Sequence, residues 1–364
     1  MKILFIGSRL YDDIDWYVRS KGIESVLTES NEEAINLDLP DQVFIVPRGM
    51  EGPKNVALMQ NVDAIVPLIG IDPPLIDVAY MKEEIEKQHS IPVIAADVRA
   101  VELTSNKIKT KEFYEDINVN TPKYQVLNSP DELKLSFPVV LKQGEGQGGK
   151  DISIAQSMED VVEYFTNFNQ ALCEEFIEGS EISIEVLGYG GEYVALPPIY
   201  KGETTLEGTH PLNKVKSGPC MVEGLDNNLV QHVAYKIAKN LNSDGIFEMD
   251  FMFSKNSKEL YAIEVNTRPN GTRYLTTATC GVNSLYELVN MACGEFSLKD
   301  IYDKLQYFYS TEIPIGNYEG PQPKEPVKSF KENDFVVHGP EGYQRVTARS
   351  NSKEELEELV GKLI

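Results

Sequence analysis

The sequence has no run of apolar residues long enough to cross a membrane, which takes about 18 to 20. The N-terminal MKILFIGS passes directly into the polar RLYDDID, without a site typical of signal-peptide cleavage. We therefore interpret these first residues as a buried strand. We expect a soluble chain with no membrane partner.

Cysteine and histidine are also scarce. The four cysteines (Cys173, Cys220, Cys280 and Cys293) form no CxxC pair, which indicates reduced thiols and a cytoplasmic protein. The four histidines (His89, His210, His232 and His338) form no HxH or HxxxH pair that would place two ligands on one face. The sequence thus gives no support for a zinc site.

Basic residues are outnumbered, with 34 Lys and Arg against 57 Asp and Glu and a net charge of -23. A field of this sign repels nucleic acid and anionic membranes, so we expect neither as a partner. A phosphate-bearing ligand must therefore be bound by a local site.

What is present is a folded chain of 364 residues, of which 41% are hydrophobic and 25% charged, and its length favours two or three packed units. In the first hundred residues short apolar runs alternate with amphipathic stretches, which predicts a parallel sheet with helical crossovers. The apolar runs are ILFIG, IESVL, QVFIV, DAIVPLIG and IPVIA. The first turn offers only Gly7 instead of GxGxxG, so a nicotinamide dehydrogenase fits poorly. We expect a small ligand at the carboxyl ends of the strands, near Gly7, Gly70 and Asp72.

A glycine-rich segment opens the next unit, after a predicted helix over 104–118. FPVVLKQGEGQGGKDISI predicts a strand, a loop with four glycines in six positions, and a second strand. Backbone amides of such a loop can converge on phosphate oxygens, and Lys142 and Lys150 bracket it with positive charge. A flexible hairpin without any ligand has the same pattern.

Paired acidic residues follow in a predicted hairpin, FEMDFMF and AIEVNTRP, with Asn256 and Ser257 at its turn. Alternation places Glu248 and Asp250 on one face of the first strand, and Glu264, Asn266 and Arg268 on one face of the second. If the strands pair in register, Asp250 and Glu264 converge into an oxygen-rich set typical of magnesium that carries nucleotide phosphates. An ordinary solvated sheet face is the alternative. Beyond residue 301 the prolines at 314, 321, 323 and 326 predict an irregular stretch, then a last hairpin and a helix over 352–363.

Four motifs in this order resemble the ATP-grasp superfamily: a nucleotide-fold N-terminal unit, a lysine-strand-glycine flap, the hinge CEEFIEGSE, and a hairpin with EVNTRPNGT. The last is most similar to the carbamoyl-phosphate synthase large-chain and biotin carboxylase type. The resemblance implies an α/β and α+β fold with a Rossmann-like pre-ATP-grasp domain (1–103), a small lid subdomain with the flap (104–175), an ATP-grasp lobe with the metal site (176–300), and a C-terminal extension (301–364).

By the same resemblance, one set of residues would bind ATP. Lys142 would contact the phosphates from the strand that enters the flap, with Lys107 as the second lysine and Gly146, Gly148 and Gly149 in the flap itself. The hinge Glu174, Glu175, Phe176 and Ile177 would contact adenine largely through backbone groups, and Glu181 the ribose. Relatives commonly have Glu-Lys where this chain has Glu174-Glu175.

A second set would hold metal and substrates. Asp250, Glu264 and Asn266 match the ligands of two magnesium ions, with manganese as the alternative metal, and Arg268 matches an arginine that stabilises the transferring phosphoryl group. Arg273 would bind the acceptor carboxylate, or form a structural ion pair. His210, Lys214 and Lys216 are candidates in a loop that closes over substrate, where a solvated loop is the alternative.

The implied activity is an ATP-dependent carboxylate-amine ligase that proceeds through an acyl-phosphate, releases ADP and acts on an amino acid or small peptide, in cell-wall or cofactor biosynthesis. Its partners would be small-molecule carboxylates and amines, and relatives are often homodimers. Three alternatives remain: a carbamoyl-phosphate-synthase-like enzyme acting on bicarbonate and ammonia, an inactive ATP-binding regulatory protein, and a kinase. The chain has length for only one of the two synthase halves, which favours the amino acid or peptide ligase.

Overall fold

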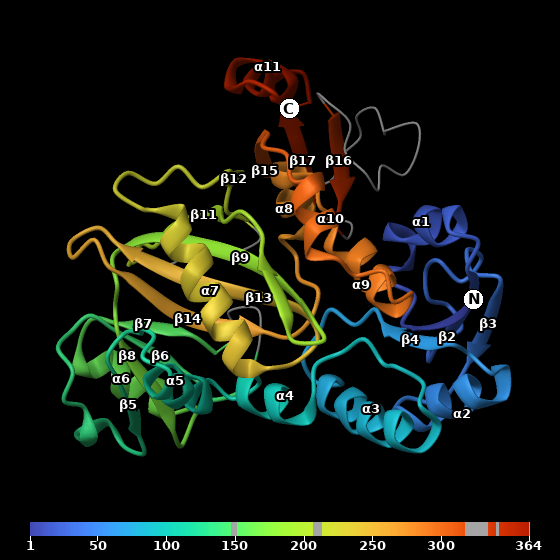
Figure 1. The fold of residues 1–364 in the computed structure, drawn as a ribbon. Coiled ribbons are helices and arrows are strands. Elements are labelled where there is room, and N and C mark those ends of the chain that lie inside the picture. Colours follow the sequence, from blue (N-terminus) through green and yellow to red (C-terminus); the bar gives the residue numbers. More distant parts are fainter. Residues whose placement is uncertain (147–150, 207–212, 317–333, 340–341, 364) are drawn as a thin grey trace.

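Three β-sheets organise the chain in the computed structural model, which describes residues 1–146, 151–206, 213–316, 334–339 and 342–363 (Figure 1). A four-stranded sheet lies in the N-terminal unit, a second four-stranded sheet in the glycine-flap unit, and a nine-stranded sheet in the remainder. The mixed α/β and α+β architecture predicted from the sequence is confirmed. The division into four units stays a prediction.

The N-terminal sheet is parallel, in the order β3-β2-β1-β4, as the alternating pattern predicts. Its strands are β1 (Lys2–Ile6), β2 (Glu24–Glu29), β3 (Gln42–Ile45) and β4 (Ala64–Pro67). The 3-10 turn η1 (Tyr11–Asp13) and three helices, α1 (Asp15–Ser20), α2 (Glu51–Gln60) and α3 (Leu75–His89), connect them and extend beyond β4. The carboxyl ends of β1 and β4 therefore point to one edge, where the sequence predicts a ligand.

Two predicted elements of this region are shorter than expected. The run IPVIA makes only an isolated parallel bridge between Val93 and Ile65, because the Ala95 amide donates to the Val93 carbonyl and turns the chain out of the ladder. The helix predicted over 104–118 is α5 (Lys107–Asp116), and a separate helix, α4 (Val98–Thr104), precedes it with a break between the two. The break falls at Asn106, whose side chain accepts hydrogen bonds from the amides of Ile108 and Lys109 and so caps α5.

The flap unit is a small antiparallel sheet in the order β5-β8-β6-β7. Its elements are β5 (Tyr124–Leu127), the 3-10 turn η2 (Pro130–Glu132), β6 (Val139–Lys142), β7 (Ser153–Ala155), α6 (Met158–Phe165) and β8 (Ala171–Glu175). Strands β6 and β7 pair antiparallel, which confirms the strand-loop-strand reading of the glycine-rich segment. Ser157 and Asp160 form a capping box at the start of α6.

The large sheet runs β14-β13-β9-β11-β12-β15-β17-β16, with β10 attached to β9. Its first strands are β9 (Gly179–Tyr189), β10 (Glu192–Ala195), β11 (Ile199–Glu203), β12 (Lys216–Gly218), β13 (Gly245–Ser254) and β14 (Leu260–Asn266). The helices of this part are α7 (Asn227–Leu241), α8 (Arg273–Cys280), α9 (Ser284–Ala292) and α10 (Leu298–Lys304). Helix α7 lies across one face of this sheet (Figure 1), where Ile237 and Ala238 pack with Phe247 and Met249 in one buried cluster.

The C-terminal segment is more regular than the prolines predict. β15 (Tyr309–Gly316), β16 (Asp334–His338) and β17 (Gln344–Ser350) extend the large sheet, and α11 (Lys353–Leu363) closes the chain. Pro314 lies inside β15, next to a register shift where an irregular strand tolerates the missing N–H. The last hairpin and the last helix are confirmed, whereas Pro321, Pro323 and Pro326 lie outside the described residues.

Apolar packing joins the N-terminal unit to the large sheet. Ile3 and Phe5 of β1 share one buried cluster with Leu187 of β9, Ile246 of β13 and Leu285 of α9. The opposite face of the N-terminal sheet packs on α2 and α3 in a separate cluster. One face of the N-terminal sheet is therefore held against the start of β13, close to the predicted metal hairpin.

Candidate active site

A buried group of two lysines and one glutamate lies where the resemblance predicts ATP phosphates. Lys142 ends β6, and its Nζ lies 2.9 Å from Oε2 of Glu174 on β8. The other carboxylate oxygen, Oε1, lies 3.1 Å from Nζ of Lys111 on α5. The Glu174 side chain thus serves as the shared counter-ion of two lysines rather than pointing away from them.

Charge pairing and burial oppose each other in this group. Burial alone would raise the pKa of Glu174, but the ammonium groups of Lys111 and Lys142 hold it below its ordinary value. Burial lowers the pKa of Lys111 to about 8, although the Glu174 carboxylate opposes the shift. A buried carboxylate between two lysines keeps both ammonium groups in fixed positions.

Lys107 contacts the flap and lies near the acidic hairpin. Its backbone amide donates to the Gly144 carbonyl at 2.7 Å and its Nζ to the Gly146 carbonyl at 2.6 Å. Burial lowers its pKa, while Glu264 of the hairpin raises it and Lys142 lowers it further. Predicted site residues from α5, the flap strand and the hairpin therefore share one region. Gly148 and Gly149 lie outside the described residues.

The predicted adenine hinge begins with the last two residues of β8 and continues past the end of that strand. The Glu175 carboxylate accepts a hydrogen bond from the Lys123 amide at 3.1 Å, and the Phe176 amide donates to the Pro138 carbonyl at 3.2 Å. Ile177 is half-buried. Further along, Oε1 of Glu181, the predicted ribose ligand, lies 2.5 Å from Nζ of Lys214. The nucleotide roles of these residues stay predictions.

The acidic hairpin pairs as the sequence predicts. Strands β13 and β14 are antiparallel, with Asp250 directly opposite Glu264 and Glu248 directly opposite Asn266. The register shifts immediately after Asp250, so this alignment is kept only at the end that faces the N-terminal unit. The convergence of Asp250 and Glu264 is therefore confirmed.

Two further charged residues, Glu185 and Lys201, lie beside the hairpin. We call the whole group the acid cluster: Glu185, Lys201, Glu248, Asp250, Glu264 and Asn266. Nζ of Lys201 lies 2.5 Å from Oδ2 of Asp250, and Nδ2 of Asn266 donates to Oε2 of Glu248 at 3.2 Å. Burial raises the pKa of Glu248 to about 7, and the neighbouring Asp250 adds to the rise. Glu185 faces Glu248 across β9 and β13, and burial raises its pKa to about 7 as well.

The donor set fits magnesium that arrives with a nucleotide. Among the described residues, no three His, Cys, Asp or Glu side chains are gathered as a closed metal cage. Such a cage is unnecessary, because magnesium in nucleotide sites needs one or two carboxylates together with phosphate oxygens and water. Asp250 and Glu264 would be those two carboxylates, and within the described part Oδ1 of Asp250 is buried without a hydrogen-bond partner.

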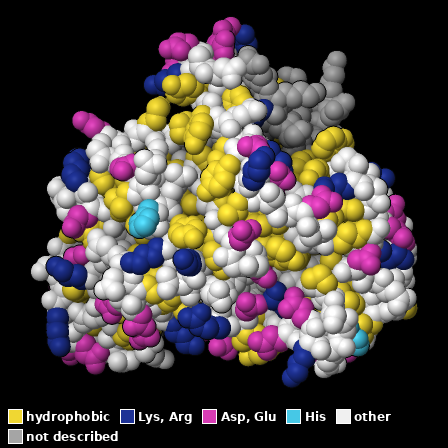
Figure 2. Space-filling model, viewed as in Figure 1, with side chains coloured by type: hydrophobic (Ala, Val, Ile, Leu, Met, Phe, Trp, Pro, Cys, Tyr) yellow, Lys and Arg dark blue, Asp and Glu magenta, His cyan; other side chains and the backbone are white. Residues whose placement is uncertain are grey.

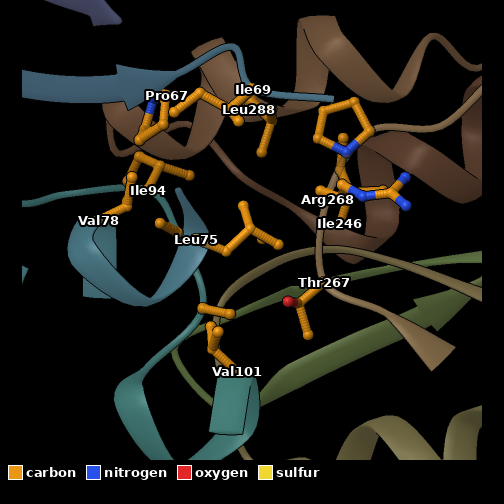
Figure 3. Close-up of a pocket in the computed structure, with 14 residues that line it drawn as sticks. Pro67, Ile69, Leu75, Val78, Ile94, Val101, Ile246, Thr267, Arg268 and Leu288 are labelled. Atoms are coloured by element: carbon orange, nitrogen blue, oxygen red, sulfur yellow. The ribbon is translucent and has the colours of Figure 1, made fainter. Parts of the chain in front are cut away.

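Arg268 lies two residues after Asn266 of the acid cluster, and its guanidinium contacts two other side chains. Its Nε forms an ion pair with Oδ1 of Asp72, from the loop after β4, and its Nη2 lies 3.4 Å from Oδ1 of Asn266. Beside it is a small, mainly apolar hollow of about 30 Å³, between the N-terminal unit and the start of β13. Figure 3 shows the Arg268 guanidinium pointing away from this hollow and the Thr267 hydroxyl pointing toward it. Arg268 therefore stands at the junction of the two units.

Arg273 is engaged by an acid of the N-terminal unit. Its Nη2 lies 2.8 Å from Oδ2 of Asp13, and its Nη1 donates to the Asn270 carbonyl at 2.8 Å. Burial would lower the pKa of Arg273, but the Asp13 carboxylate raises it above its ordinary value. The contact favours the structural alternative, and the role of Arg273 on a substrate carboxylate stays a prediction.

The predicted substrate loop is only partly described. His210 lies outside the described residues. Lys214 contacts Glu181, as above, whereas Lys216 is buried on β12 with its Nζ 2.7 Å from Oε1 of Glu312 on β15. Of these candidates, Lys214 therefore lies beside a predicted nucleotide residue and Lys216 lies in a separate buried pair.

Several residues of the site were not singled out from the sequence: Asp13, Lys111, Glu185 and Lys201. Lys111 had a signal, because it is one turn after Lys107 on the same helix and i and i+4 residues share a face. Lys201 lies on β11, two strands away from β13 in the sheet order, and no local pattern links it to Asp250.

The outer surface has two further features. No helix in the described parts of the chain is long and apolar enough to cross a membrane. On the face drawn in Figure 2, Lys and Arg side chains are scattered among acidic and apolar ones.

Comparison with known sequences identifies the domain type. Residues 104–272 match the family of the ATP-grasp domain. A curated "Carbamoyl-phosphate synthase" from Methanobrevibacter smithii is 75% identical over 367 aligned residues, which cover all of both chains. A "Carbamoyl phosphate synthase large chain" from Thermoanaerobacter pseudethanolicus is 21% identical over 301 residues. That alignment covers 79% of this chain and only 27% of the large chain.

Solved structures agree on the fold. The biotin carboxylase domain of 2-oxoglutarate carboxylase from Hydrogenobacter thermophilus, described with MgADP, ADP and bicarbonate, superposes with a TM-score of 0.80. It is 20% identical, over 100% of this chain and 89% of that one. An L-amino acid ligase from Bacillus licheniformis gives a TM-score of 0.77 at 19% identity, over 100% of this chain and 96% of that one.

Proposed function

The chain belongs to the ATP-grasp family of carbon-nitrogen ligases, and from this premise we propose that it joins the carboxylate of an amino acid or small peptide to an amine through an acyl-phosphate, with release of ADP. The carboxylate-amine ligase class follows from the family. The substrate, the intermediate and the residue roles are the proposal.

One observation carries the proposal. The charges of both Lys142 and Glu264 shift the pKa of Lys107, so all three side chains lie near one another. Asp250 lies directly opposite Glu264. Cationic groups that would bind phosphates and oxygen groups that would bind magnesium thus lie in one region. This is the arrangement that phosphoryl transfer needs, since that reaction depends on positioning and charge stabilisation.

The proposed reaction has two steps. A carboxylate oxygen attacks the γ-phosphorus of ATP, and the bond from that phosphorus to the β-γ bridging oxygen breaks, giving ADP and an acyl-phosphate. The amine nitrogen then attacks the acyl carbon, phosphate leaves, and the amine loses a proton. Lys107, Lys142 and Arg268 would stabilise charge on the phosphoryl oxygens, and Asp250, Glu264 and Asn266 would hold magnesium, which neutralises the phosphates.

The full-length match to a free-standing ligase supports an amino acid or small peptide as the substrate. The chain covers 96% of the L-amino acid ligase from Bacillus licheniformis, although it also covers all of the 75% identical carbamoyl-phosphate synthase from Methanobrevibacter smithii, so length fits both substrates. A single unit of this length suits a free-standing ligase. A role in cell-wall peptide or cofactor synthesis would follow from such a substrate.

Bicarbonate is the second candidate substrate, with ammonia as the amine. The name of the 75% identical relative from Methanobrevibacter smithii favours it, and so does the bicarbonate in the description of the Hydrogenobacter thermophilus structure. That structure is also described as a dimer, which supports a homodimer here. A light-scattering mass of twice 40.8 kDa would test the dimer.

The experiment is nucleotide release from Mg-ATP with three separate additions: pooled amino acids, pooled dipeptides, and bicarbonate with ammonia. ADP and AMP are separated and products are identified by mass spectrometry. ADP with a new amide mass in the amino acid or dipeptide pool supports the proposal, and carbamoyl phosphate in the third addition supports the second candidate. AMP would overturn the acyl-phosphate route. ATP binding without turnover in any addition would indicate a regulatory protein.

A further inference from the structure

Asp72 is the acid of the N-terminal unit that reaches furthest into the site. It lies in the loop after β4, at the carboxyl edge of the parallel sheet, and forms its ion pair with Nε of Arg268. The pair is well shielded, with the Arg268 side chain 11% exposed and the Asp72 side chain 25% exposed. A contact of this kind between two units fixes the arginine more firmly than a surface pair does.

The backbone beside this pair is also closely packed. A Cβ built on Gly70 would lie 3.5 Å from the Pro269 carbonyl oxygen, so the two loops leave room for little more than one methyl group between them. Pro269 immediately follows Arg268 and restricts its backbone toward extended conformations. Asp72 and Arg268 are therefore presented to each other by two loops that lie close together.

The two contacts of Arg268 use one edge of the guanidinium. Nε pairs with Asp72 and Nη2 lies 3.4 Å from Oδ1 of Asn266. Within the described residues, Nη1 has no hydrogen-bond partner. The other edge, formed by Nη1 and the remaining Nη2 proton, can accept a bidentate contact from phosphoryl oxygens.

We propose that Asp72 is the positioning residue of the phosphoryl-transfer step: it holds Nε of Arg268, so that the opposite edge of the guanidinium faces the transferring phosphoryl group. This inference rests on the proposed function, because it assigns Arg268 to that group. It makes the N-terminal unit part of the catalytic apparatus, since the flap and the hairpin alone leave Arg268 without this contact.

Loss of the contact between Asp72 and Arg268 should weaken binding of the transition state more than binding of ATP. In the proposed function Lys107 and Lys142 would contact the ground-state nucleotide, whereas a positioned Arg268 would act on charge that develops during transfer. Loss of Asp72 should therefore lower kcat and leave the KM for ATP nearly unchanged. Since small misplacements of a catalytic group cost up to about a hundredfold, we expect Asp72→Ala to lower kcat between about tenfold and a hundredfold.

A double-mutant cycle tests the assignment with the substrate found in the pools. Asp72→Ala should have less than about a twofold effect on kcat when Arg268 is already alanine, because the two residues act as one unit. Asp72→Asn keeps an oxygen acceptor for Nε and should restore kcat to within about fivefold of the unmodified protein. Equal effects of Asp72→Ala in both backgrounds would overturn the assignment, because a structural defect multiplies with the loss of Arg268.

A binding measurement keeps the test independent of the carboxylate. Calorimetry compares Mg-ADP alone with Mg-ADP plus aluminium fluoride, a mimic of the transferring phosphoryl group. Asp72→Ala should leave the Kd of Mg-ADP within about twofold and raise the Kd of the fluoride complex about tenfold. Equal Kd values for the fluoride complex in the variant and the unmodified protein would overturn the assignment.

The control is Asp77→Ala, an exposed aspartate on α3 five positions further on, which should change neither Kd nor kcat. If no addition supports ADP release but the fluoride complex still depends on Asp72, the proposed function fails and the positioning role stands. If ADP is released but Asp72→Ala lowers kcat by the same factor with and without Arg268, the positioning role fails and the proposed function stands.

Discussion

At the scale of single residues, the site depends on buried charges that are stable only as pairs. Glu174 contacts Lys111 and Lys142, and all three side chains are buried. Removing one member of a buried group leaves the others without compensation, whereas the whole group contributes little net stability. The main role of Glu174 is therefore to fix the positions of Lys111 and Lys142, and the complete group adds little to the stability of the fold.

We predict that Glu174→Gln lowers the free energy of unfolding by about 3 to 5 kcal/mol, because it strands two ammonium groups. Urea denaturation of the purified protein would measure the loss. Glu175→Gln is the matched control, since among the described residues the Glu175 carboxylate accepts a backbone hydrogen bond from Lys123 and forms no ion pair. Equal stability of the two variants would show that the lysines are not held by Glu174.

The buried carboxyl group of Glu185 should give the fold a distinct pH dependence. Burial raises its pKa from 4.5 to about 7, so between these pH values the folded state binds more protons than the unfolded chain. The free energy of unfolding must then fall as pH rises through this window. We predict that Glu185→Gln flattens this slope and stabilises the protein at pH 8 by roughly 2 to 3 kcal/mol.

Thermal denaturation at a series of pH values checks this prediction. Glu248 has a pKa raised in the same direction, so part of the slope should remain in the variant. An unchanged slope would mean that Glu185 is ionised in the fold.

For catalysis, Glu264→Gln should abolish ADP formation and leave the fold intact. An amide keeps the size of the side chain but removes the charge that magnesium requires. Glu259→Gln, on the exposed loop of the same hairpin, is the control and should behave as the unmodified protein. Near-normal turnover of Glu264→Gln, with circular dichroism unchanged, would reject the metal assignment.

At the scale of elements, the β9–β13 pairing sets the geometry of the acid cluster. It spans ten residue pairs from Gly245 to Ser254 and places Glu185 opposite Glu248. At its far end, Gly179 lies so close to β13 that a Cβ would meet the Phe253 carbonyl oxygen at 2.0 Å. Only glycine allows the two strands to approach at this point.

Gly179→Ala should therefore cost about 3 kcal/mol or more, because backbone atoms of β13 must move. Gly361→Ala on α11 is the matched control, since a Cβ there meets nothing within 4 Å and alanine favours a helix by roughly 0.5 to 1 kcal/mol. Chemical denaturation of both variants would compare them. An unchanged free energy of unfolding in Gly179→Ala would show that β9 and β13 can move apart at little cost.

The elements themselves were largely predictable from the sequence, because their signals are local. Alternation identified β13 and β14, and their pairing required only that a short hairpin close on itself. Helix α4 was not predicted, and the helix predicted from residue 104 begins at Lys107 instead, because Asn106 caps it there. Strand β15 was missed because Pro314 argues against a strand in general but is tolerated next to a register shift.

Contacts between distant elements were not predictable in this way. Asp72 was expected near a ligand, yet nothing in the sequence pairs it with Arg268, 196 positions later. The partners of Arg273 and Asp250, namely Asp13 and Lys201, likewise come from other elements. Residue types and spacing thus indicated the chemistry, whereas the counter-ions depend on how the units pack.

At the scale of the whole molecule, one junction connects the N-terminal unit, α8 and the C-terminal hairpin. Asp13 pairs with Arg273 and accepts a hydrogen bond from the Tyr274 hydroxyl at 2.5 Å. The Tyr274 ring stacks on His338 of β16, with ring centroids 4.1 Å apart. Burial lowers the pKa of His338 to about 3, so this ring is neutral in the stack near neutral pH.

We predict that Asp13→Ala destabilises the protein by about 3 to 5 kcal/mol, because it leaves the buried Arg273 guanidinium without its counter-charge. Asp15→Ala is the control, since it removes a surface pair with Arg19 and should cost less than about 1 kcal/mol. Limited proteolysis beside denaturation would show whether the units separate. Equal unfolding free energies and equal proteolysis of the two variants would show that the contact between Asp13 and Arg273 does not hold the units together.

In the proposed reaction, this ligase activates a carboxylate by phosphorylation. The most direct measurement is transfer of oxygen-18 from a labelled carboxylate substrate to inorganic phosphate, followed by mass spectrometry after turnover with Mg-ATP. An acyl-phosphate predicts one labelled oxygen in each phosphate released beside ADP. Unlabelled phosphate formed together with the amide, or label found in AMP, would contradict the account.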